Sequence, residues 1–283
     1  MENPEGFVFD DDLAVPALAA RGYGVQSIPW TSSSVDWNSF DVVIPRTTWD
    51  YHHHLDKFLM VMENIDRSSA RLANSLALFR WNAHKSYLFD LERQGVAIVP
   101  TVSGTGLTPE RLQSIRRTFN GAPIIVKPTV GANADFTWPV RNETPRELIG
   151  RICAHYRDRE YLAQPFMEGV ISEGEFSLFF FNGDLSHTIL KTPKREDFRV
   201  QEEHGGIITA VTPDPGMVNT GRLVMRTLPA VPLYARVDFV RDRAGAFRLM
   251  ELELIEPALY FRMDPESPAR FARALDEWMK KPG

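Results

Sequence analysis

Four charged side chains near the end of the chain have the spacing of a metal or phosphate site. Residues 235–257 alternate polar and apolar side chains on both sides of a turn that contains Asp and Gly, which predicts a β-hairpin. Because side chains alternate between the two faces of a strand, one face would carry Arg236 and Asp238 beside Glu251 and Glu253. Three carboxylates repel one another unless a cation lies among them, and Mg²⁺ prefers oxygen ligands. The alternative is the solvated polar face of an ordinary antiparallel hairpin.

A second group of polar residues directly follows a predicted buried strand at residues 41–45. This group contains Arg46, Asp50 and Tyr51, and polar residues just beyond the carboxyl end of a strand commonly bind ligands in α/β sheets. We expect Arg46 and Asp50, which have opposite charges, to hold a ligand that carries groups of both signs, with Tyr51 in the same pocket. In the alternative interpretation, Asp50 only caps the helix predicted for residues 52–65.

A lysine ends the apolar strand predicted for residues 123–128, and a charge in that position needs a partner. The segment after Lys127, residues 129–135, is small and polar, as expected for a mobile loop over a ligand. The alternative is a plain hairpin loop beside a lysine whose ammonium extends to solvent. Residues 192–206 are charged and end in glycine, which predicts a second loop that folds over a site.

Two residue types with metal or redox chemistry receive no functional role from the sequence. The three consecutive histidines, residues 52–54, are not expected to form a metal triad, because adjacent helical positions face different directions. Cys153 is the single cysteine, so the chain cannot form an internal disulfide framework. Its place on a predicted helix favours core packing.

The composition is that of a folded enzyme of ordinary charge. The 283 residues can bury a full core and divide into two or three subdomains, with 43% hydrophobic and 24% charged residues. A net charge of -5 gives no basic surplus, so we expect no nucleic-acid partner. No apolar run reaches about 18 residues, and the first residues do not form a basic and then apolar leader, so we expect no membrane partner. With a single cysteine, these features predict a cytoplasmic protein.

Predicted helices and strands alternate along most of the chain, which favours a mixed α/β fold. The expected helices are residues 13–20, 52–65, 81–94, 108–119, 145–156 and 268–280. The expected strands are residues 25–30, 41–45, 96–101, 123–128 and 161–166, followed by a hairpin over 175–191 and the hairpin over 235–257. No apolar strand precedes Asp10, so the first domain either lacks its first strand or retains only residues 6–9 of it.

The order of these parts resembles the ATP-grasp superfamily of carboxylate–amine ligases, which includes glutathione synthetase and D-alanine–D-alanine ligase. The resemblance extends from Arg46 to Phe261. It implies an α/β (α+β) fold with an N-terminal α/β substrate domain at residues 1–73. A central lid subdomain would follow at residues 74–166, and an antiparallel-sheet subdomain with the metal site at 167–283. The nucleotide cleft would lie between the last two parts.

Several residues match nucleotide-binding positions of this superfamily. Lys85 and Lys127 match its two nucleotide lysines, and cations from two different elements can neutralise the several negative charges of a triphosphate. Glu175 resembles the acid that binds the ribose hydroxyl groups, and Lys191 supplies a further cation. A hinge whose backbone contacts the adenine edge, while apolar side chains enclose the ring, is implied for Gln164, Pro165, Phe166 and Met167.

The hairpin matches the metal triad of the superfamily, so the resemblance implies ATP and one or two Mg²⁺ ions, with Mn²⁺ as a substitute. The matching ligands are Asp238, Glu251 and Glu253, and relatives commonly have Asn at the third position. Arg236 matches an arginine that stabilises a transferring phosphoryl group or an oxyanion.

Two further residues are assigned from the loop at 192–206. Arg199 resembles the arginine of the γ-phosphate loop, and Gly206, at the end of this loop, is expected beside the substrate. The run from Arg46 to Tyr51 and the run from Asp197 to Gly206 are most similar to a small branch of the superfamily. That branch includes the cyclo-ligase of D-cycloserine biosynthesis.

The resemblance implies that ATP phosphorylates a substrate carboxylate, and that a nitrogen then attacks the acyl phosphate. The partner would be a small amino-acid-like molecule, and a homo-oligomer is compatible with the sequence. In the branch that contains the cyclo-ligase, both reacting groups belong to one substrate, as in cyclisation of O-ureidoserine during antibiotic biosynthesis. Two alternatives share the same ATP contacts: an ATP-dependent kinase of a small molecule, and a nucleotide-binding regulator without catalysis.

Overall fold

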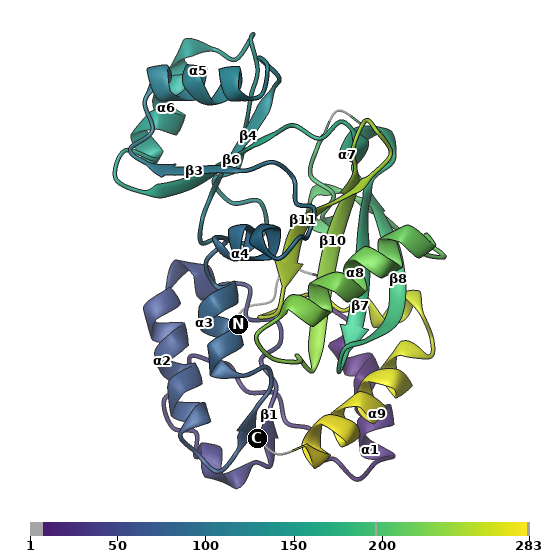
Figure 1. The fold of residues 1–283 in the computed structure, drawn as a ribbon. Helices are drawn as coiled ribbons and strands as arrows, with labels where there is room; N and C mark the ends of the chain where they lie inside the picture. Colours follow the sequence, from purple (N-terminus) through teal and green to yellow (C-terminus); the bar gives the residue numbers. More distant parts are fainter. Residues whose placement is uncertain (1–7, 196, 282–283) are drawn as a thin grey trace.

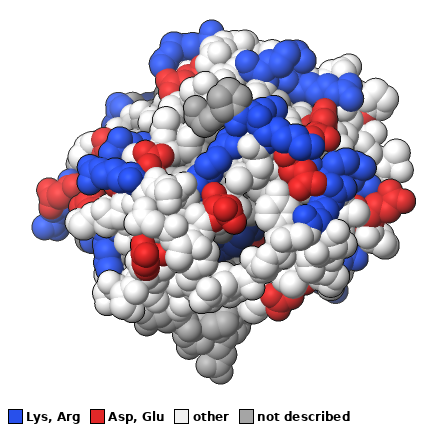
Figure 2. All heavy atoms as spheres, turned by 90° about the horizontal axis from the view of Figure 1, so that it is seen from below, with Lys and Arg blue, Asp and Glu red and all other residues white. Residues whose placement is uncertain are grey.

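The computed structural model describes residues 8–195 and 197–281, which form three groups of elements (Figure 1). The first group is built on a two-stranded sheet, the second on a four-stranded sheet and the third on a five-stranded sheet. Among the described residues, no helix is both long enough and apolar enough to cross a membrane. Lys and Arg side chains are interspersed with Asp and Glu on the face drawn in Figure 2.

The first group packs helices against a short parallel pair of strands. A small aromatic and aliphatic core fixes this group, with Trp30, Phe58 and Phe79 in contact edge to face. The elements are η1 (Asp11–Ala14), α1 (Val15–Ala19), η2 (Trp37–Ser39), β1 (Val42–Val43), η3 (Tyr51–His53), α2 (Leu55–Asp66), β2 (Arg71–Leu72) and α3 (Leu76–Asn82).

Two strands predicted for this group are not observed as expected. The predicted strand at residues 25–30 is wrong: none of these residues is in a strand, and Val25 is exposed to solvent. An apolar run with no neighbouring strand to pair with does not form a ladder. For the expected remnant strand at 6–9, Gly6 and Phe7 lie outside the described residues, and Val8 and Phe9 are not in a strand.

The second group is an antiparallel sheet in the order β3-β6-β4-β5 with two helices on one face. Its own core contains Ile124, Val126 and Tyr161, and the helices contribute Leu112 and Ile152. The strand and helix predictions for 123–128, 161–166, 108–119 and 145–156 are confirmed. The elements are β3 (Val102–Thr105), α5 (Pro109–Thr118), β4 (Ile124–Pro128), β5 (Trp138–Val140), α6 (Arg146–His155) and β6 (Glu160–Pro165).

The third group contains both predicted hairpins, in the strand order β11-β10-β7-β8-β9. The tight turn between β7 and β8 has Asn182 at φ 51° and Gly183 at φ 91°, as a type I′ turn requires. The elements are α7 (Gly169–Ser172), β7 (Glu175–Phe181), β8 (Asp184–Thr192), η4 (Glu202–His204), β9 (Ile207–Ala210), α8 (Pro215–Thr227), β10 (Tyr234–Arg241), β11 (Phe247–Glu253), η5 (Phe261–Met263) and α9 (Ser267–Lys280).

The two faces of the five-stranded sheet have different partners. One face, with Leu178, Val237 and Phe239, packs against α8 and against α4 (Tyr87–Arg93). On the other face, Phe181 and Tyr234 form a core with α9 and α1. The same face also carries the charged residues Glu175, Lys191, Arg236 and Asp238, which form one wall of the cleft described below.

The hairpin of β10 and β11 contains one irregularity. Asp238 pairs with Glu251, but the next residue, Phe239, pairs with Leu249. Met250 is therefore an extra residue in β11, and the register shift at this point is a β-bulge.

The helix predicted for residues 81–94 is interrupted. It is replaced by α3, which ends at Asn82, and α4, which begins at Tyr87. Between them, the backbone N–H of Lys85 donates to the carbonyl of Thr129 at 2.8 Å, so this turn is bound to the second group. The predicted strand at 96–101 is also wrong in extent, because only Ile98 forms an isolated parallel bridge, with Leu249.

Candidate active-site cleft

A single cleft between the four-stranded and five-stranded sheets collects most of the residues singled out from the sequence. Its walls come from β4 and β6 on one side, and from β7, β8, β10 and β11 on the other. Two loops border it, at residues 131–137 and 198–203. The predicted site residues that line the cleft are Tyr51, Lys85, Lys127, Gln164, Pro165, Phe166, Met167, Glu175, Lys191, Arg199, Arg236, Asp238, Glu251 and Glu253.

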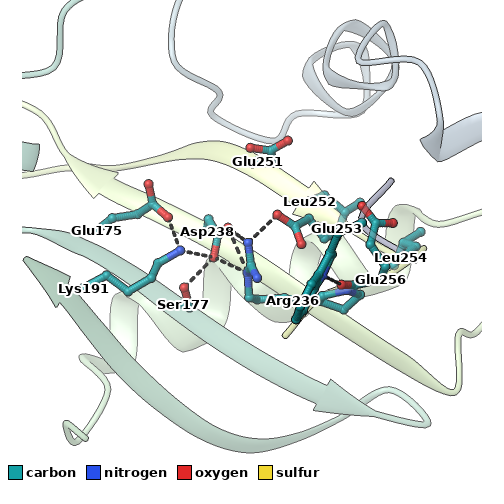
Figure 3. Close-up of polar contacts among 12 residues, drawn as sticks. Glu175, Ser177, Lys191, Arg236, Asp238, Glu251, Leu252, Glu253, Leu254 and Glu256 are labelled. Atoms are coloured by element: carbon teal, nitrogen blue, oxygen red, sulfur yellow. Dashed lines mark hydrogen bonds and ion pairs between the residues drawn. The ribbon is translucent and has the colours of Figure 1, made fainter. Parts of the chain in front are cut away.

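The register of the hairpin places the four predicted charges opposite one another. Arg236 pairs with Glu253 across the strands, and Asp238 pairs with Glu251. These side chains share a face with Ser177 of β7 (Figure 3), whose hydroxyl donates to Asp238 at 2.5 Å. Asp238 is only 1% exposed, so the alternative of a solvated polar hairpin face does not describe this carboxylate.

Cations hold the buried carboxylate in one orientation. The Nε of Arg236 donates to both oxygens of Asp238, at 3.0 and 3.1 Å, while its Nη2 forms an ion pair with Glu253. Lys191 lies between Glu175, with which it forms an ion pair, and Asp238 at 3.5 Å (Figure 3). Each charge in this group therefore has a neighbour of opposite sign, as burial demands.

The two glutamates of β11 differ in their electrostatic environments. Burial opposes ionisation of Glu251, but the ammonium groups of Lys85 and Lys127 outweigh it and lower the pKa of this carboxyl to about 2. Burial raises the pKa of Glu253 to about 7, although Arg236 acts in the opposite direction. The nearby carboxylates of Glu251 and Asp238 raise this pKa further.

These carboxylates fit a divalent cation. Asp238, Glu251 and Glu253 offer hard oxygen ligands from facing positions of two adjacent strands. Burial raises the pKa of Glu253 and the carboxylates of Glu251 and Asp238 add to this effect, so a divalent ion among the three would favour its ionised form.

Two lysines reach the cleft from the opposite wall. Lys85 forms an ion pair with Glu251, so the interruption between α3 and α4 brings the first predicted nucleotide lysine to the hairpin. Lys127 is the second-last residue of β4. Its relative solvent exposure is 9%, and it lines the cleft. Within residues 8–195 and 197–281, its ammonium makes no ion pair closer than 4.0 Å. Burial lowers the pKa of Lys127, and the more distant carboxylate of Glu251 acts in the opposite direction without cancelling this effect. A bound anion would provide that compensation.

One end of the cleft is apolar and suits an aromatic ring. Met167 and Met250 pack with Val99 and Val170, and all four line the cleft. Within the predicted hinge, the N–H of Phe166 already donates to the carbonyl of Pro123 at 2.8 Å.

The remaining hinge residues have unequal hydrogen-bonding capacity. Pro165 has no N–H, and the side-chain amide of Gln164 donates to the Thr101 hydroxyl at 2.9 Å. Among the described residues, no hydrogen-bond acceptor is found for the N–H of Met167, so this backbone donor of the hinge is available to a ligand.

Arg199 lines the cleft from the loop that precedes β9. Its guanidinium forms a two-point contact with Asp197, at 3.1 Å from Nε and 2.9 Å from Nη2. The hydrogen bonds from Arg199 lower the pKa of Asp197. The arginine is half-exposed, so it can change partners at low cost.

Three residues predicted to bind substrate lie outside the cleft lining. The guanidinium of Arg46 makes two hydrogen bonds of 3.0 Å to Asp11 and one of 2.5 Å to the carbonyl of Pro257. Asp50 accepts from the indole N–H of Trp30 at 2.8 Å and makes no side-chain cap to a helix.

Gly206 has a backbone role in this structure. A Cβ at this position would lie 2.0 Å from the carbonyl oxygen of Val200, so only glycine allows the loop to close on itself here.

Sequence reasoning gave no role to Glu256, which the structure places in the cleft. Its side chain is 6% exposed, and burial, reinforced by Glu253, raises its pKa well above the ordinary value. The indole N–H of Trp49 donates to its carbonyl at 2.8 Å, so the first group fixes this segment. The only sequence signal for Glu256 was a carboxylate directly before Pro257. The alternating pattern of the hairpin does not include it, because β11 ends at Glu253.

The contacts of Arg46 lead to a stability prediction. Arg46→Ala should lower the free energy of unfolding by about 1.5 to 3 kcal/mol, the loss typical of a hydrogen-bonded charge. Urea denaturation measures this change, and Arg67→Ala, which removes an exposed pair with Glu63, is the control. An unchanged stability would instead support the role in ligand binding that the sequence predicts for Arg46.

The fold and the cleft together define the class of this protein, because two antiparallel sheets that enclose a charged cleft are the arrangement of ATP-grasp ligases. The crystal structure of D-cycloserine synthetase DcsG superposes with a TM-score of 0.83 at 25% sequence identity, covering 95% of this chain and 94% of that one. The ATP-grasp ligase PsnB, complexed with a phosphomimetic variant of its minimal precursor, Mg and ADP, gives a TM-score of 0.66 at 14% identity. That match covers 95% of this chain and 94% of PsnB.

Sequence comparison gives the particular family. Residues 1–74 match the family described as D-cycloserine synthetase DcsG, N-terminal domain. The chain is 30% identical over 292 aligned positions to the cycloserine biosynthesis protein DcsG of Streptomyces lavendulae, and the alignment covers 95% of each protein. The chain belongs to the DcsG family of ATP-grasp ligases, which confirms the resemblance to this superfamily and to its small branch.

Proposed function

We propose that this chain is an ADP-forming ligase that uses ATP to close a C–N bond within one amino-acid-derived substrate, such as O-ureidoserine. The observation that carries the proposal is the pairing of Arg236 and Asp238 with Glu253 and Glu251 across one cleft wall, opposite Lys127. The 30% sequence identity to DcsG, which extends over 95% of each protein, supports a substrate of the same chemical class.

The proposal assigns a part of the cleft to each part of ATP. The apolar end with Met167 and Met250 would enclose the adenine, and Glu175 would contact the ribose. The cations that would bind the phosphates are Lys85, Lys127, Lys191 and Arg199. Asp238, Glu251 and Glu253 would hold Mg²⁺, which when bound supplies charge compensation for the phosphate oxygens.

The reaction needs no nucleophilic side chain. A substrate carboxylate oxygen attacks the γ-phosphorus, the bond to the bridging oxygen breaks, and ADP leaves. The nitrogen of the same substrate then attacks the acyl carbon, loses its proton and expels phosphate. Arg236 would stabilise the negative charge that develops on oxygen during these steps, and the cleft walls would exclude water from the acyl phosphate.

We also propose a division of labour along the chain. Residues 1–73 would bind substrate, residues 74–166 would form the lid and residues 167–283 would hold the metal. Within this division, α4 packs against the five-stranded sheet, so the moving part of the lid would begin after it.

The test is product analysis with purified full chain, ATP, Mg²⁺ and either enantiomer of O-ureidoserine. A ligase releases ADP and phosphate in equal amounts and produces a cyclic amide. A stable phosphorylated substrate without free phosphate would favour the kinase, and no ADP with any amino-acid substrate would favour the nucleotide-binding regulator.

Arg236 offers a further test of the mechanism. Arg236→Ala should lower kcat by about 10²- to 10³-fold, the effect typical of removing one donor to a developing oxyanion. The KM for ATP should change much less, because the lysines remain. Steady-state kinetics measure both, with Arg248→Ala on the neighbouring strand as the control; Arg248 pairs with Asp242 outside the cleft. An equal change in both constants would assign Arg236 to ATP binding.

A further inference from the structure

A second cluster of potential metal ligands lies at the border of the cleft, away from the carboxylates of β10 and β11. The Nε2 of His52 lies 3.2 Å from a carboxylate oxygen of Asp135, and the Nε2 of His53 lies 3.8 Å from the same oxygen. One ligand atom from each of the three residues can be chosen so that all lie within 4.8 Å of one another. The centroids of the two imidazole rings are 3.9 Å apart.

From the sequence, no metal triad is expected of the three consecutive histidines, and the cluster contains two of them together with Asp135. Adjacent histidines were expected to point in different directions, but η3 is a tight turn that ends at His53, and both rings turn towards Asp135. His54, the third histidine of the run, is exposed and lies outside the cluster.

The spacing and chemistry of the cluster suit a transition-metal ion. Tetrahedral zinc has bonds of about 2.0 to 2.1 Å to imidazole and carboxylate, which places ligand atoms roughly 3.3 Å apart. Two imidazoles and one carboxylate are zinc ligands, whereas Mg²⁺ prefers oxygen alone.

The three ligands come from different parts of the fold. His52 and His53 belong to η3 in the first group of elements, while Asp135 belongs to the loop between β4 and β5. This loop follows Lys127, and its residues 131–135 line the cleft. A metal ion bound to all three residues would therefore fasten the loop to the first group at the cleft border.

We propose that His52, His53 and Asp135 bind a zinc-type transition-metal ion that fastens the loop at residues 129–137 over the cleft. The start of this loop is already held, because the carbonyl of Thr129 accepts from the N–H of Lys85. The metal fixes its far end. This site is separate from the Mg²⁺ site of the proposed function, and it uses nitrogen ligands that the Mg²⁺ site lacks.

The test is a titration of the full chain with Zn²⁺, without nucleotide and with excess Mg²⁺ to occupy the carboxylates of the hairpin. Co²⁺ serves as a visible-absorption probe of tetrahedral nitrogen and oxygen ligation. The wild type should bind one Zn²⁺, and Asp135→Ala and His53→Ala should each weaken binding more than about tenfold, the loss that even an outer-shell partner produces. Both side chains are about half exposed, so their removal leaves the core intact.

The matched control is His54→Ala, which removes the neighbouring histidine outside the cluster and should leave Zn²⁺ affinity unchanged. Hydrogen exchange gives a second measurement: Zn²⁺ should slow exchange in residues 129–137 of the wild type, and not in Asp135→Ala. Absence of Zn²⁺ binding, or equal affinity in wild type and Asp135→Ala, would overturn the proposal. So would binding that leaves exchange in the loop unchanged. None of these outcomes depends on ATP turnover.

Discussion

Glu251→Gln should lower kcat for ATP-dependent turnover by about 10³-fold at saturating Mg²⁺. The carboxylate has a pKa lowered to about 2 by the neighbouring lysines, so at neutral pH it carries the full negative charge that the proposed metal site requires. A neutral amide keeps the shape but cannot balance the metal charge, and a loss of about 4 kcal/mol of metal-ion stabilisation corresponds to this factor. ADP release under Mg²⁺ saturation measures the effect.

Two variants separate charge from folding in this experiment. Glu253→Asn, which introduces the residue common in relatives, retains a carbonyl ligand and should keep part of the activity. Glu277→Gln removes an exposed carboxylate of α9 and should behave as wild type. A wild-type rate for Glu251→Gln would mean that this face of the hairpin binds no catalytic metal.

Lys127→Ala should weaken ATP binding by roughly 10- to 100-fold. Its ammonium is buried in the cleft wall, and the described residues provide no ion pair for it. A charge-assisted contact to phosphate is worth about 1.5 to 3 kcal/mol, and about 1.4 kcal/mol corresponds to one factor of ten in affinity. Calorimetric titration with ATP measures the change directly.

The control for Lys127 is Lys280→Ala, an exposed lysine at the end of α9 that should leave ATP affinity unchanged. Thermal unfolding of the Lys127→Ala protein without nucleotide should show a midpoint at least as high as wild type. The reason is that the pKa of this lysine is lowered by burial, so the folded state is not stabilised by its charge. ATP affinity equal to wild type would contradict the assignment of the cleft to a triphosphate.

The sequence predicted the charged wall of the cleft because that wall depends on local rules. Alternation along two strands and a short turn are enough to place Arg236 opposite Glu253, and Asp238 opposite Glu251. The hairpin at Asn182 was equally predictable, since a type I′ turn needs residues that tolerate positive φ.

Contacts between distant residues could not be predicted in the same way. Arg46 has its carboxylate partner 35 residues earlier and its carbonyl partner 211 residues later. No periodic pattern encodes such pairs. The position of Arg46 after a strand therefore suggested that it binds a ligand, whereas in the structure it binds residues of the same chain. The break at Lys85 has the same cause, because the acceptor Thr129 belongs to another part of the fold.

The convergence of His52 and Asp135 spans 83 residues and was likewise not accessible from the sequence. The helical rule applied to the histidine run was sound for a long α-helix. It failed because η3 is a three-residue turn, and rings at the end of such a turn can face the same side.

The extra residue in β11 has a consequence for how this family can vary. The bulge makes Met250 an extra residue beside Glu251, and both residues line the cleft, Met250 at its apolar end and Glu251 among its charged residues. Deleting Met250 would restore regular pairing and leave the carboxylates of β11 in register with β10, while removing part of the apolar end. A single-residue insertion or deletion between Glu251 and Glu253 would instead turn one of these carboxylates towards the opposite face. Length variation in this hairpin should therefore avoid residues 251–253.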